Sequence, residues 1–236
     1  MARDTERGGA MRWSLPSLLA FTGGYADASG YLALKGLFTA HVTGNFVTLG
    51  SSLVFGTSGA LTKTLALPMF CAVVLLSRLL AFRLQASRTP VFASLVRLQV
   101  LVLIVGAGLA VWLGPFDDPD GWRALVTGMT LVAAMALQNA TYRTHLAHTP
   151  PSTIMTGTTT QLMLDLAEVL HGPRPEIAAA TRARVKRLTV SVLMFAAGCG
   201  LAALLYAKVN TWCFSVLPLL GLATLTSRNE IDDADK

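Results

Sequence analysis

Long apolar runs separated by short polar connections recur along the whole chain. About 20 predominantly apolar residues are needed for an α-helix to cross the hydrocarbon core of a bilayer. The pattern predicts membrane helices over residues 14–34, 64–84, 92–114, 124–141, 188–207 and 212–225. No long polar stretch separates these runs, so we predict an all-α integral membrane protein without a soluble domain.

Two further segments, 41–55 and 152–170, mix apolar and polar residues. The second carries Thr153, Thr156, Thr158, Thr159, Thr160, Gln161, Asp165 and Glu168. A central carboxylate costs about 2.5–3.5 kcal/mol even on the lenient insertion scale, so a lipid-facing helix could not hold this set. Such groups survive at membrane depth only against protein or a water-filled cavity. We expect re-entrant segments or half-helices; for 152–170 a surface amphipathic helix is the alternative.

Composition agrees with a membrane protein and excludes other classes. The chain has 236 residues, of which 53% are hydrophobic and 14% charged, and its mean hydropathy is +0.56. Soluble domains carry about 25% charged residues. The net charge of +6 does not indicate nucleic acid as a partner, because the basic residues cluster between apolar runs. Cys71, Cys199 and Cys213 fit small core residues better than a disulfide framework or a metal site.

Charged residues give the chain an orientation. Arginine and lysine are enriched in cytoplasmic loops. Two connections are rich in them, one beside Arg78, Arg83, Arg88 and Arg97, the other beside Arg174, Arg182, Arg184, Lys186 and Arg187. Arg3, Arg7 and Arg12 place the N-terminus inside as well, while Asp117, Asp118 and Asp120 mark an external loop. The range 175–187 fits either a short helix on the inner membrane surface or a solvated loop.

Eight full crossings conflict with this orientation, because the third segment would end outside with its arginines. The conflict disappears if 41–55 and 152–170 do not cross. Each half then has three crossings and one re-entrant segment, so the second half enters the membrane upside down. We predict a cytoplasmic tail (1–12), a first repeat (13–114), an external loop (115–121), a second repeat (122–227) and a cytoplasmic tail (228–236). We also expect residues 14–34 to be an uncleaved first span.

A weak internal duplication supports the two repeats. Asp27-Ala28-Ser29 returns as Asn139-Ala140-Thr141, 112 residues later, and Thr43-Gly44-Asn45 returns as Thr156-Gly157-Thr158, 113 residues later. Polar, glycine-broken segments at matching places in two halves are typical of transporters with a midplane site at the repeat interface. We expect these residues to bind a solute, with Asp27 and Asn139 close together across a pseudo-two-fold axis.

Several of these residues have a structural alternative. Asp27 is an intramembrane acid, which predicts proton or cation binding, but it could instead cap a broken helix. The Thr-Gly segments could open half-helices whose N-termini meet at the midplane, or be ordinary, tightly packed helix starts. His41 could relay protons or sit in a loop. Asp165 and Glu168 lie on one helix face and could extend the relay or pair with the nearby basic residues.

Other motifs carry little functional information. His145 and His148 are three apart, yet they adjoin Thr149-Pro150-Pro151, which predicts a loop and not a metal site. Gly56-Thr57-Ser58-Gly59 is similar to a serine motif of intramembrane proteases, but no positioned base accompanies it. No phosphate-binding Gly-Lys-Ser/Thr loop is present. We expect no enzyme activity, cofactor or metal. The small residues between Ala196 and Ala203 predict close helix contact.

Two blocks in the first half carry a family resemblance. Residues Gly24-Tyr25-Ala26-Asp27-Ala28-Ser29-Gly30-Tyr31 and 36–45 are similar in sequence and spacing to the YoaK-like family, uncharacterised bacterial multi-span membrane proteins. Residues 138–140 and 155–158 also fit. The resemblance covers about residues 15 to 225 and implies a protein of the bacterial plasma (inner) membrane. The family supplies no activity or ligand.

Two functions remain open from sequence. The first is a small-solute transporter or permease, with protons as one candidate coupling ion and the lipid bilayer as its surroundings. The second is a membrane scaffold or stress-response protein that transports nothing. A cavity lined by Asp27, Asn139 and the two Thr-Gly segments favours the first, and a packed, dry core favours the second.

Overall fold

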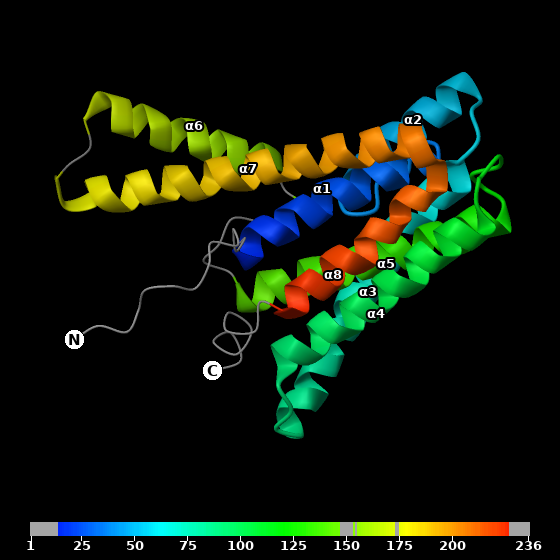
Figure 1. The fold of residues 1–236 in the computed structure, drawn as a ribbon, viewed down its shortest axis with the longest axis horizontal. Helices are drawn as coiled ribbons and strands as arrows, with labels where there is room; N and C mark the ends of the chain where they lie inside the picture. The colour runs from blue at the N-terminus through cyan, green and yellow to red at the C-terminus, as the bar shows by residue number, and fades with distance from the viewer. Residues whose placement is uncertain (1–13, 147–152, 154, 173–174, 227–236) are drawn as a thin grey trace.

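The computed structural model describes residues 14–146, 153, 155–172 and 175–226, and within these residues the chain is helical with no strand. Eight α-helices and two 3₁₀ turns follow one another (Figure 1). They are α1 Leu15–Ala33, η1 Val42–Gly44, α2 Asn45–Phe55, α3 Ala60–Ala86, α4 Val91–Leu113, α5 Trp122–His145, α6 Met155–His171, α7 Pro175–Val209, η2 Asn210–Ser215 and α8 Val216–Thr226. Predictions for Arg3, Arg7, Arg12, His148, Arg174 and the tail 228–236 fall outside the described residues.

Four helical stretches in the described part of the chain are long and apolar enough to cross a membrane: Ala60–Ala86, Val91–Leu113, Trp122–His145 and Ile177–Thr226. The first helix, α1, is too polar to join them, because glycine, serine, threonine and Asp27 interrupt its apolar residues. Most of α1 is nevertheless buried. Other helices, and not lipid, therefore surround α1, which explains why it tolerates its polar side chains.

Large apolar side chains cover much of the outside of the molecule. Leu75 and Leu76 on α3 are each 61% exposed, and many other large apolar side chains are open on the helix surfaces. Apolar area of this extent on a monomer marks contact with lipid or with another protein. Trp112, Trp122 and Trp212 are exposed where α4 ends, α5 begins and α7 meets α8, which is one end of the molecule (Figure 1). Tryptophan prefers the membrane–water interface.

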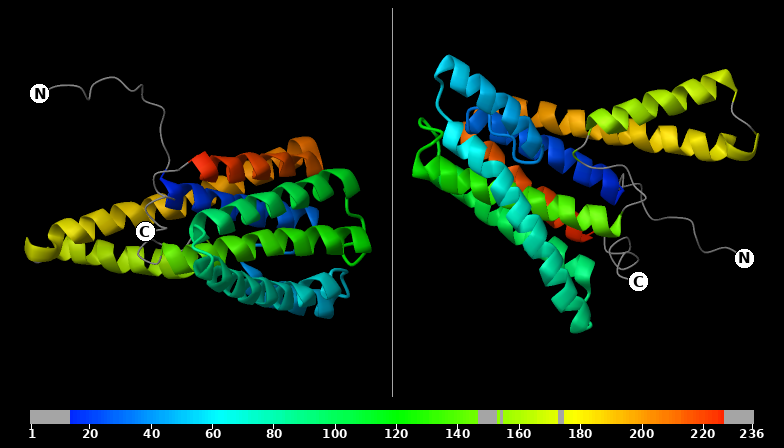
Figure 2. Two further views of the ribbon diagram at one scale, coloured as in Figure 1. Left: turned by 90° about the horizontal axis from the view of Figure 1, so that it is seen from below. Right: turned by 180° about the vertical axis from the view of Figure 1, so that it is seen from behind.

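The helix α7 is longer than the sequence pattern predicted. We expected a short helix or loop over 175–187 followed by a span over 188–207, but both form one helix of 35 residues. No glycine or proline interrupts the chain between Glu176 and Ala197, so nothing ends the helix there. The helix α6 packs along the first part of α7, and together they form a two-helix arm that projects beyond the other helices (Figures 1 and 2).

Two glycines determine the most extensive helix contact, between α1 and α7. A Cβ atom on Gly24 would lie 2.1 Å from the carbonyl oxygen of Phe195, and one on Gly198 would lie 2.2 Å from that of Phe21. Only glycine allows two backbones to approach so closely. The Cys199 thiol donates a hydrogen bond across the contact to the carbonyl of Gly24, at 3.3 Å. The close helix contact predicted for residues 196–203 is confirmed at Gly198, whereas Ala196, Ala197, Gly200 and Ala203 are exposed.

We predict that Gly198→Ala destabilises the protein, because its new methyl group meets backbone of α1, which cannot rotate away. Overfilling a packed contact costs about 1–3 kcal/mol. Gly200→Ala is the matched control, since it lies on the same helix and a Cβ atom added there would have nothing within 4 Å. Thermal unfolding in detergent measures both variants. Equal melting temperatures for the two would contradict the proposed role of the α1–α7 contact.

Candidate functional site

The carboxylate of Asp27 secures the point where the chain turns back after α1. Beyond Ala33 the chain reverses through Lys35 and Gly36, both with positive φ (49° and 98°). The N–H of Ala40 then donates to Asp27 Oδ1 at 2.6 Å, and the N–H of His41 donates to both carboxylate oxygens at 3.1 Å. Asp27 lies six residues, about 9 Å, before the end of α1. The segment after α1 thus returns along it, and buried N–H groups find an acceptor in Asp27.

Further polar side chains hold the same segment. Asn45, buried at the start of α2, uses both ends of its amide: the N–H of Phe38 donates to Oδ1 at 2.8 Å, and Nδ2 donates to the Phe38 carbonyl at 2.9 Å. The Thr39 hydroxyl donates to the carbonyl of Ala26 at 3.0 Å. These bonds replace those of a regular helix. Asn45, predicted to bind solute, therefore has a structural role in this state.

The remaining predicted residues of the first half surround this turn. Thr43 and Gly44 form η1, directly before α2. A Cβ atom on Gly44 would lie 3.0 Å from the ring of Phe38, so glycine allows the aromatic side chain to pack here. His41 is exposed, and its backbone, not its imidazole, donates to Asp27. The imidazole lies 6.0 Å from the Phe38 ring, measured between centroids.

The second half repeats the arrangement with an amide. Asn139 Oδ1 accepts a hydrogen bond from the hydroxyl of Thr153 at 2.7 Å, 14 residues further along the chain. Asn139 Nδ2 donates to the carbonyl of Met135, one helical turn earlier, at 2.9 Å. The helix α6 begins at Met155, so Thr156, Gly157 and Thr158 form its first turn. Asn139 and Asp27 thus each link a long helix to the segment that follows it, Asp27 through backbone N–H groups and Asn139 through a side-chain hydroxyl.

The two linking residues bond to different segments in this structure, Asp27 to residues 40 and 41 and Asn139 to Thr153. Gln138, beside Asn139, donates through Nε2 to the carbonyl of Leu19 at 3.0 Å. Leu19 lies eight residues before Asp27, a distance of about 12 Å along α1. Along α1, Asp27 therefore lies beyond the point where Gln138 contacts this helix. The helices α2 and α6 likewise lie toward opposite ends of the molecule (Figure 1).

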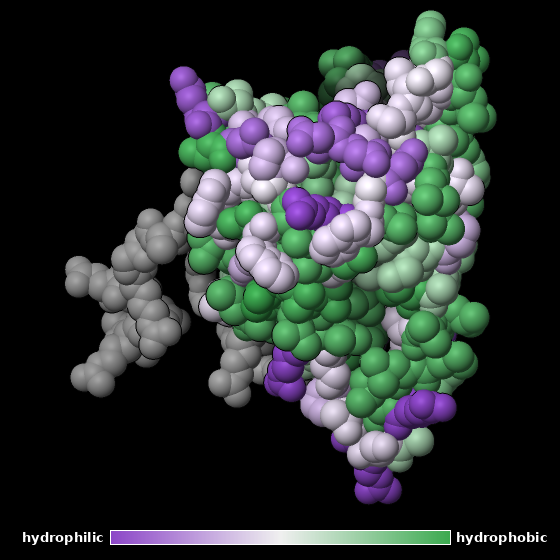
Figure 3. Space-filling model, turned by 90° about the vertical axis from the view of Figure 1, so that its right-hand side faces the viewer, coloured by the Kyte–Doolittle hydropathy of each residue, from purple (hydrophilic) through white to green (hydrophobic). Residues whose placement is uncertain are grey.

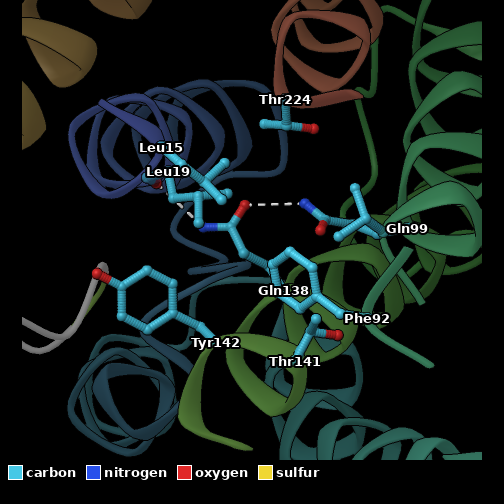
Figure 4. Close-up of a pocket in the computed structure, with 9 residues that line it drawn as sticks. Leu15, Leu19, Phe92, Gln99, Gln138, Thr141, Tyr142 and Thr224 are labelled. Atoms are coloured by element: carbon cyan, nitrogen blue, oxygen red, sulfur yellow. Dashed lines mark hydrogen bonds between the residues drawn. The ribbon is translucent and has the colours of Figure 1, made fainter. Parts of the chain in front are cut away.

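A pair of buried glutamines links α4, α5 and α1 (Figure 4). Gln99 Nε2 donates to Gln138 Oε1 at 2.9 Å, and Gln138 continues the chain of bonds to Leu19. The adjoining cavity measures about 10 Å³, which is close to the space one water molecule needs. Gln99 was not among the predicted site residues, although a polar residue within the apolar run 92–114 could have indicated it.

Asp165 forms an ion pair within the two-helix arm. Its carboxylate accepts from Arg184 Nε at 2.5 Å and from Arg184 Nη2 at 2.6 Å, and Gln161 Nε2 donates to it at 2.7 Å. Asp165 is 1% exposed, whereas Arg184 is 46% exposed. The sequence left two roles open for Asp165, a proton relay or pairing with the nearby basic residues, and the geometry favours pairing. Glu168 is exposed beside the pair and close enough to Arg184 for an electrostatic interaction.

The described residues contain no group of three or more His, Cys, Asp or Glu side chains that could hold a metal ion. His145 contacts Thr144 and the carbonyl of Thr141 through Nδ1, at 2.7 and 3.1 Å, and packs beside the Phe92 ring. Polar groups in the interior are therefore used mainly to hold chain segments together.

This architecture defines the protein as a helical membrane protein in which polar side chains hold the segments between helices. A family model described as a protein of unknown function (DUF1275) matches residues 15–227, and the chain belongs to this family. The UPF0700 transmembrane protein YoaK of Bacillus subtilis (strain 168) is 30% identical over 166 residues, which cover 67% of this chain and 68% of that protein. No solved structure matches the chain.

We predict that Arg184→Gln loosens the two-helix arm. The change removes two charge-assisted hydrogen bonds to the buried Asp165 carboxylate. Each such bond contributes about 1.5–3 kcal/mol, and this range is an upper bound here because the arginine is partly exposed to solvent. Arg182→Gln removes the same charge from an exposed neighbour on the same helix and is the matched control. Hydrogen exchange of α6 amides measures the effect. Unchanged protection of α6 in Arg184→Gln would show that the ion pair does not hold the arm.

Proposed function

We propose that this protein is a small-solute transporter or permease of the bacterial plasma membrane, built from two inverted repeats. The observation that carries the proposal is the link made in both halves by a polar residue of a long helix. Asp27 accepts from backbone 13 and 14 residues later, and Asn139 accepts from Thr153, 14 residues later. Duplicated breaks of this kind are characteristic of transporters and have no evident purpose in a simple helical anchor.

The packing of the helices supports two equivalent halves. If α1 to α4 correspond to α5 to α8, the α1–α7 contact has its counterpart in α5–α3, and the α6–α7 contact in α2–α3. The α4–α5 contact has its counterpart in α8–α1, while α4–α8 and α1–α5 are their own counterparts. Each of these pairs makes contact. A two-fold relation between the halves accounts for all of them together.

The course of the chain supports an inverted relation. The helix α1 leads from the end of the molecule where α8 finishes to the end that carries the three exposed tryptophans (Figure 1). After α1, the segment 34–55 turns back from that end to the level of Asp27 and then runs toward the same end again. The helix α2 therefore does not cross the membrane. The same holds for α6 at the opposite end. Each half then has three crossings, and an odd number turns the second half upside down.

In such an architecture, the solute site lies where the repeats meet and opens to each side in turn. The segment 34–44 is well placed to move, because side-chain hydrogen bonds replace regular helix bonds there. Asp27 is the carboxylate in this position, and His41 follows it in the turn. Protonation of Asp27 would weaken the hydrogen bonds that it accepts from the N–H groups of Ala40 and His41. Proton transfer would in this way be linked to movement of the segment before α2.

One observation favours the alternative of a membrane scaffold or stress-response protein. The cavity beside Gln99 and Gln138 holds about one water molecule. Neither this cavity nor the larger pocket between α1, α2 and α3 is lined by Asp27 or Asn139. A transporter must open this region in another conformation, whereas a scaffold keeps it closed.

We predict that residue 182 faces the cytoplasm and residue 118 the outside. Single cysteines at these positions, in a chain whose Cys71, Cys199 and Cys213 are replaced, are labelled in intact cells with a membrane-impermeant maleimide. Labelling is expected at 118 and not at 182, because arginine-rich segments stay inside. Strong labelling at 182 from outside would contradict the inverted repeats.

We predict that Asp27→Asn abolishes proton-coupled flux and leaves the fold intact, because the amide oxygen still accepts backbone hydrogen bonds but carries no proton to exchange. Asp27→Ala is expected to lose both flux and stability, since the buried N–H of Ala40 loses its acceptor at a cost of about 1–3 kcal/mol and the partly buried N–H of His41 loses its acceptor as well. Proteoliposomes with an imposed pH gradient and an internal pH dye are tested against a panel of small carboxylates, amino acids, sugars, phosphate and sulfate.

Asp117→Asn is the control for this experiment, because it removes an exposed acid from the external loop. It should keep wild-type flux. Coupled flux that persists in Asp27→Asn would remove Asp27 from the mechanism. Absence of flux for every solute in the wild type, under gradients of either direction, would favour the scaffold.

A further inference from the structure

A pocket of about 340 Å³ opens at the end of the molecule that carries the exposed tryptophans, between the end of α1, α2 and the start of α3. Its polar lining consists of ammonium and hydroxyl groups, contributed mainly by Lys35, Lys63, Thr48, Ser51, Ser52 and Thr57. No carboxylate lines it among the described residues. Figure 3 faces this end of the molecule, where hydrophilic residues gather in the upper part and apolar residues surround them.

Lys63 is the unusual member of this lining. It is 6% exposed, and lysine is almost never buried to this extent unless it is paired. Within the described part of the chain, its ammonium has one hydrogen-bond partner, the hydroxyl of Ser52, at 2.7 Å. An ammonium carries three N–H donors, so a neutral hydroxyl leaves most of its capacity unused. A buried cation in this state gains from an anion that enters the pocket.

Two glycines make room for the Lys63 ammonium. Gly36 (φ +98°) and Gly59 (φ +100°) both adopt conformations that favour glycine. A Cβ atom on Gly59 would lie 3.1 Å from Lys63 Nζ, and one on Gly36 would lie 3.5 Å from it. The ammonium is therefore held in a defined position between two turns and does not extend freely from the surface.

The nearest acid, Asp120, is committed elsewhere. Its carboxylate accepts from the N–H of Gly59 at 2.8 Å and from that of Thr62 at 3.0 Å, and so caps α3. Burial raises the pKa of Asp120, but these hydrogen bonds outweigh it and hold the pKa below its usual value. No ion pair joins Asp120 to Lys63 among the described residues, although the two charges interact at longer range. Lys35 donates to the backbone carbonyl of Asp117 and keeps further donors.

We propose that this pocket binds a small oxyanion group, a carboxylate, sulfate or phosphate, and that it is the outer binding site for the solute. The second part rests on the proposed transport function; the binding of an anion does not. Lysine serves as a point charge for such groups, and hydroxyls donate the accompanying hydrogen bonds. Free anions and the phosphate of a lipid headgroup share this chemistry, and the pocket lies at the level of the tryptophans, where headgroups lie.

The first test is equilibrium binding to the purified full-length protein in neutral detergent. Sodium sulfate, sodium phosphate and sodium acetate are titrated against sodium chloride at matched ionic strength, with isothermal titration calorimetry and thermal stabilisation as readouts. We expect saturable binding of at least one oxyanion. Lys63→Gln should weaken it about 10- to 100-fold, the loss that corresponds to one charge-assisted hydrogen bond.

Two further variants keep the test decisive if Lys63→Gln does not fold. Lys35→Gln changes an exposed side chain of the same pocket and should weaken binding in the same direction. Lys208→Gln removes an exposed lysine at the end of α7 that does not line the pocket, and it should bind as the wild type does. Absence of saturable binding, or an equal loss in Lys208→Gln, would overturn the site.

Nanodiscs distinguish the two sources of the anion. If a lipid headgroup occupies the pocket, phosphatidylglycerol nanodiscs should stabilise the wild type over phosphatidylcholine nanodiscs, and Lys63→Gln should remove this difference. If a free anion is the ligand, its affinity should be equal in phosphatidylcholine nanodiscs and in detergent. Oxyanion binding without any flux would leave the site in place and refute transport, whereas flux without oxyanion binding would refute the site alone.

Discussion

Backbone N–H and C=O groups that leave a helix inside a membrane must find partners within the protein, and this constraint shapes the whole chain. Asp27 meets it where the chain turns back after α1, by accepting hydrogen bonds from Ala40 and His41. Thr39 and Asn45 meet it for the rest of that turn. This turn also places α2 against α3. Without these acceptors, the segment 34–44 would have no stable conformation beside α1.

The constraint also explains why α1, with its polar side chains, lies at the centre. The helix α1 carries the residues that hold the turn, so it must be enclosed by other helices, and α7 encloses it through the Gly24 and Gly198 contact. The apolar helices then face outward with their leucines exposed. In the second half, Asn139 accepts from the hydroxyl of Thr153, a side chain, and not from backbone N–H groups. An amide is sufficient there, whereas the first half uses a carboxylate, and this difference gives the two halves unequal chemistry.

Sequence patterns predicted the class of protein, the position of most helices and the residues at the breaks. Asp27, Asn45 and Asn139 could be singled out because polar residues inside apolar runs are costly and must have a reason. Their partners could not be predicted, since Asp27 binds backbone N–H groups, which leave no trace in the side-chain pattern. The separation of Asp27 from Asn139 depends on where α1 and α5 cross, and the duplication alone does not specify it. Lys63 lay at the edge of an apolar run, where a lysine is ordinary until its burial is known.

Hydrogen exchange at residues 34–44 tests the central interaction most directly. Amides in an ordinary loop of this length exchange rapidly, whereas amides bonded to buried carboxylates exchange slowly. In the wild-type protein, peptides covering Ala40 and His41 should be protected to a degree comparable with α1, and Asp27→Ala should remove this protection while peptides from α4 and α5 keep theirs. Rapid exchange of these amides in the wild type, or protection that survives in Asp27→Ala, would contradict the role assigned to Asp27.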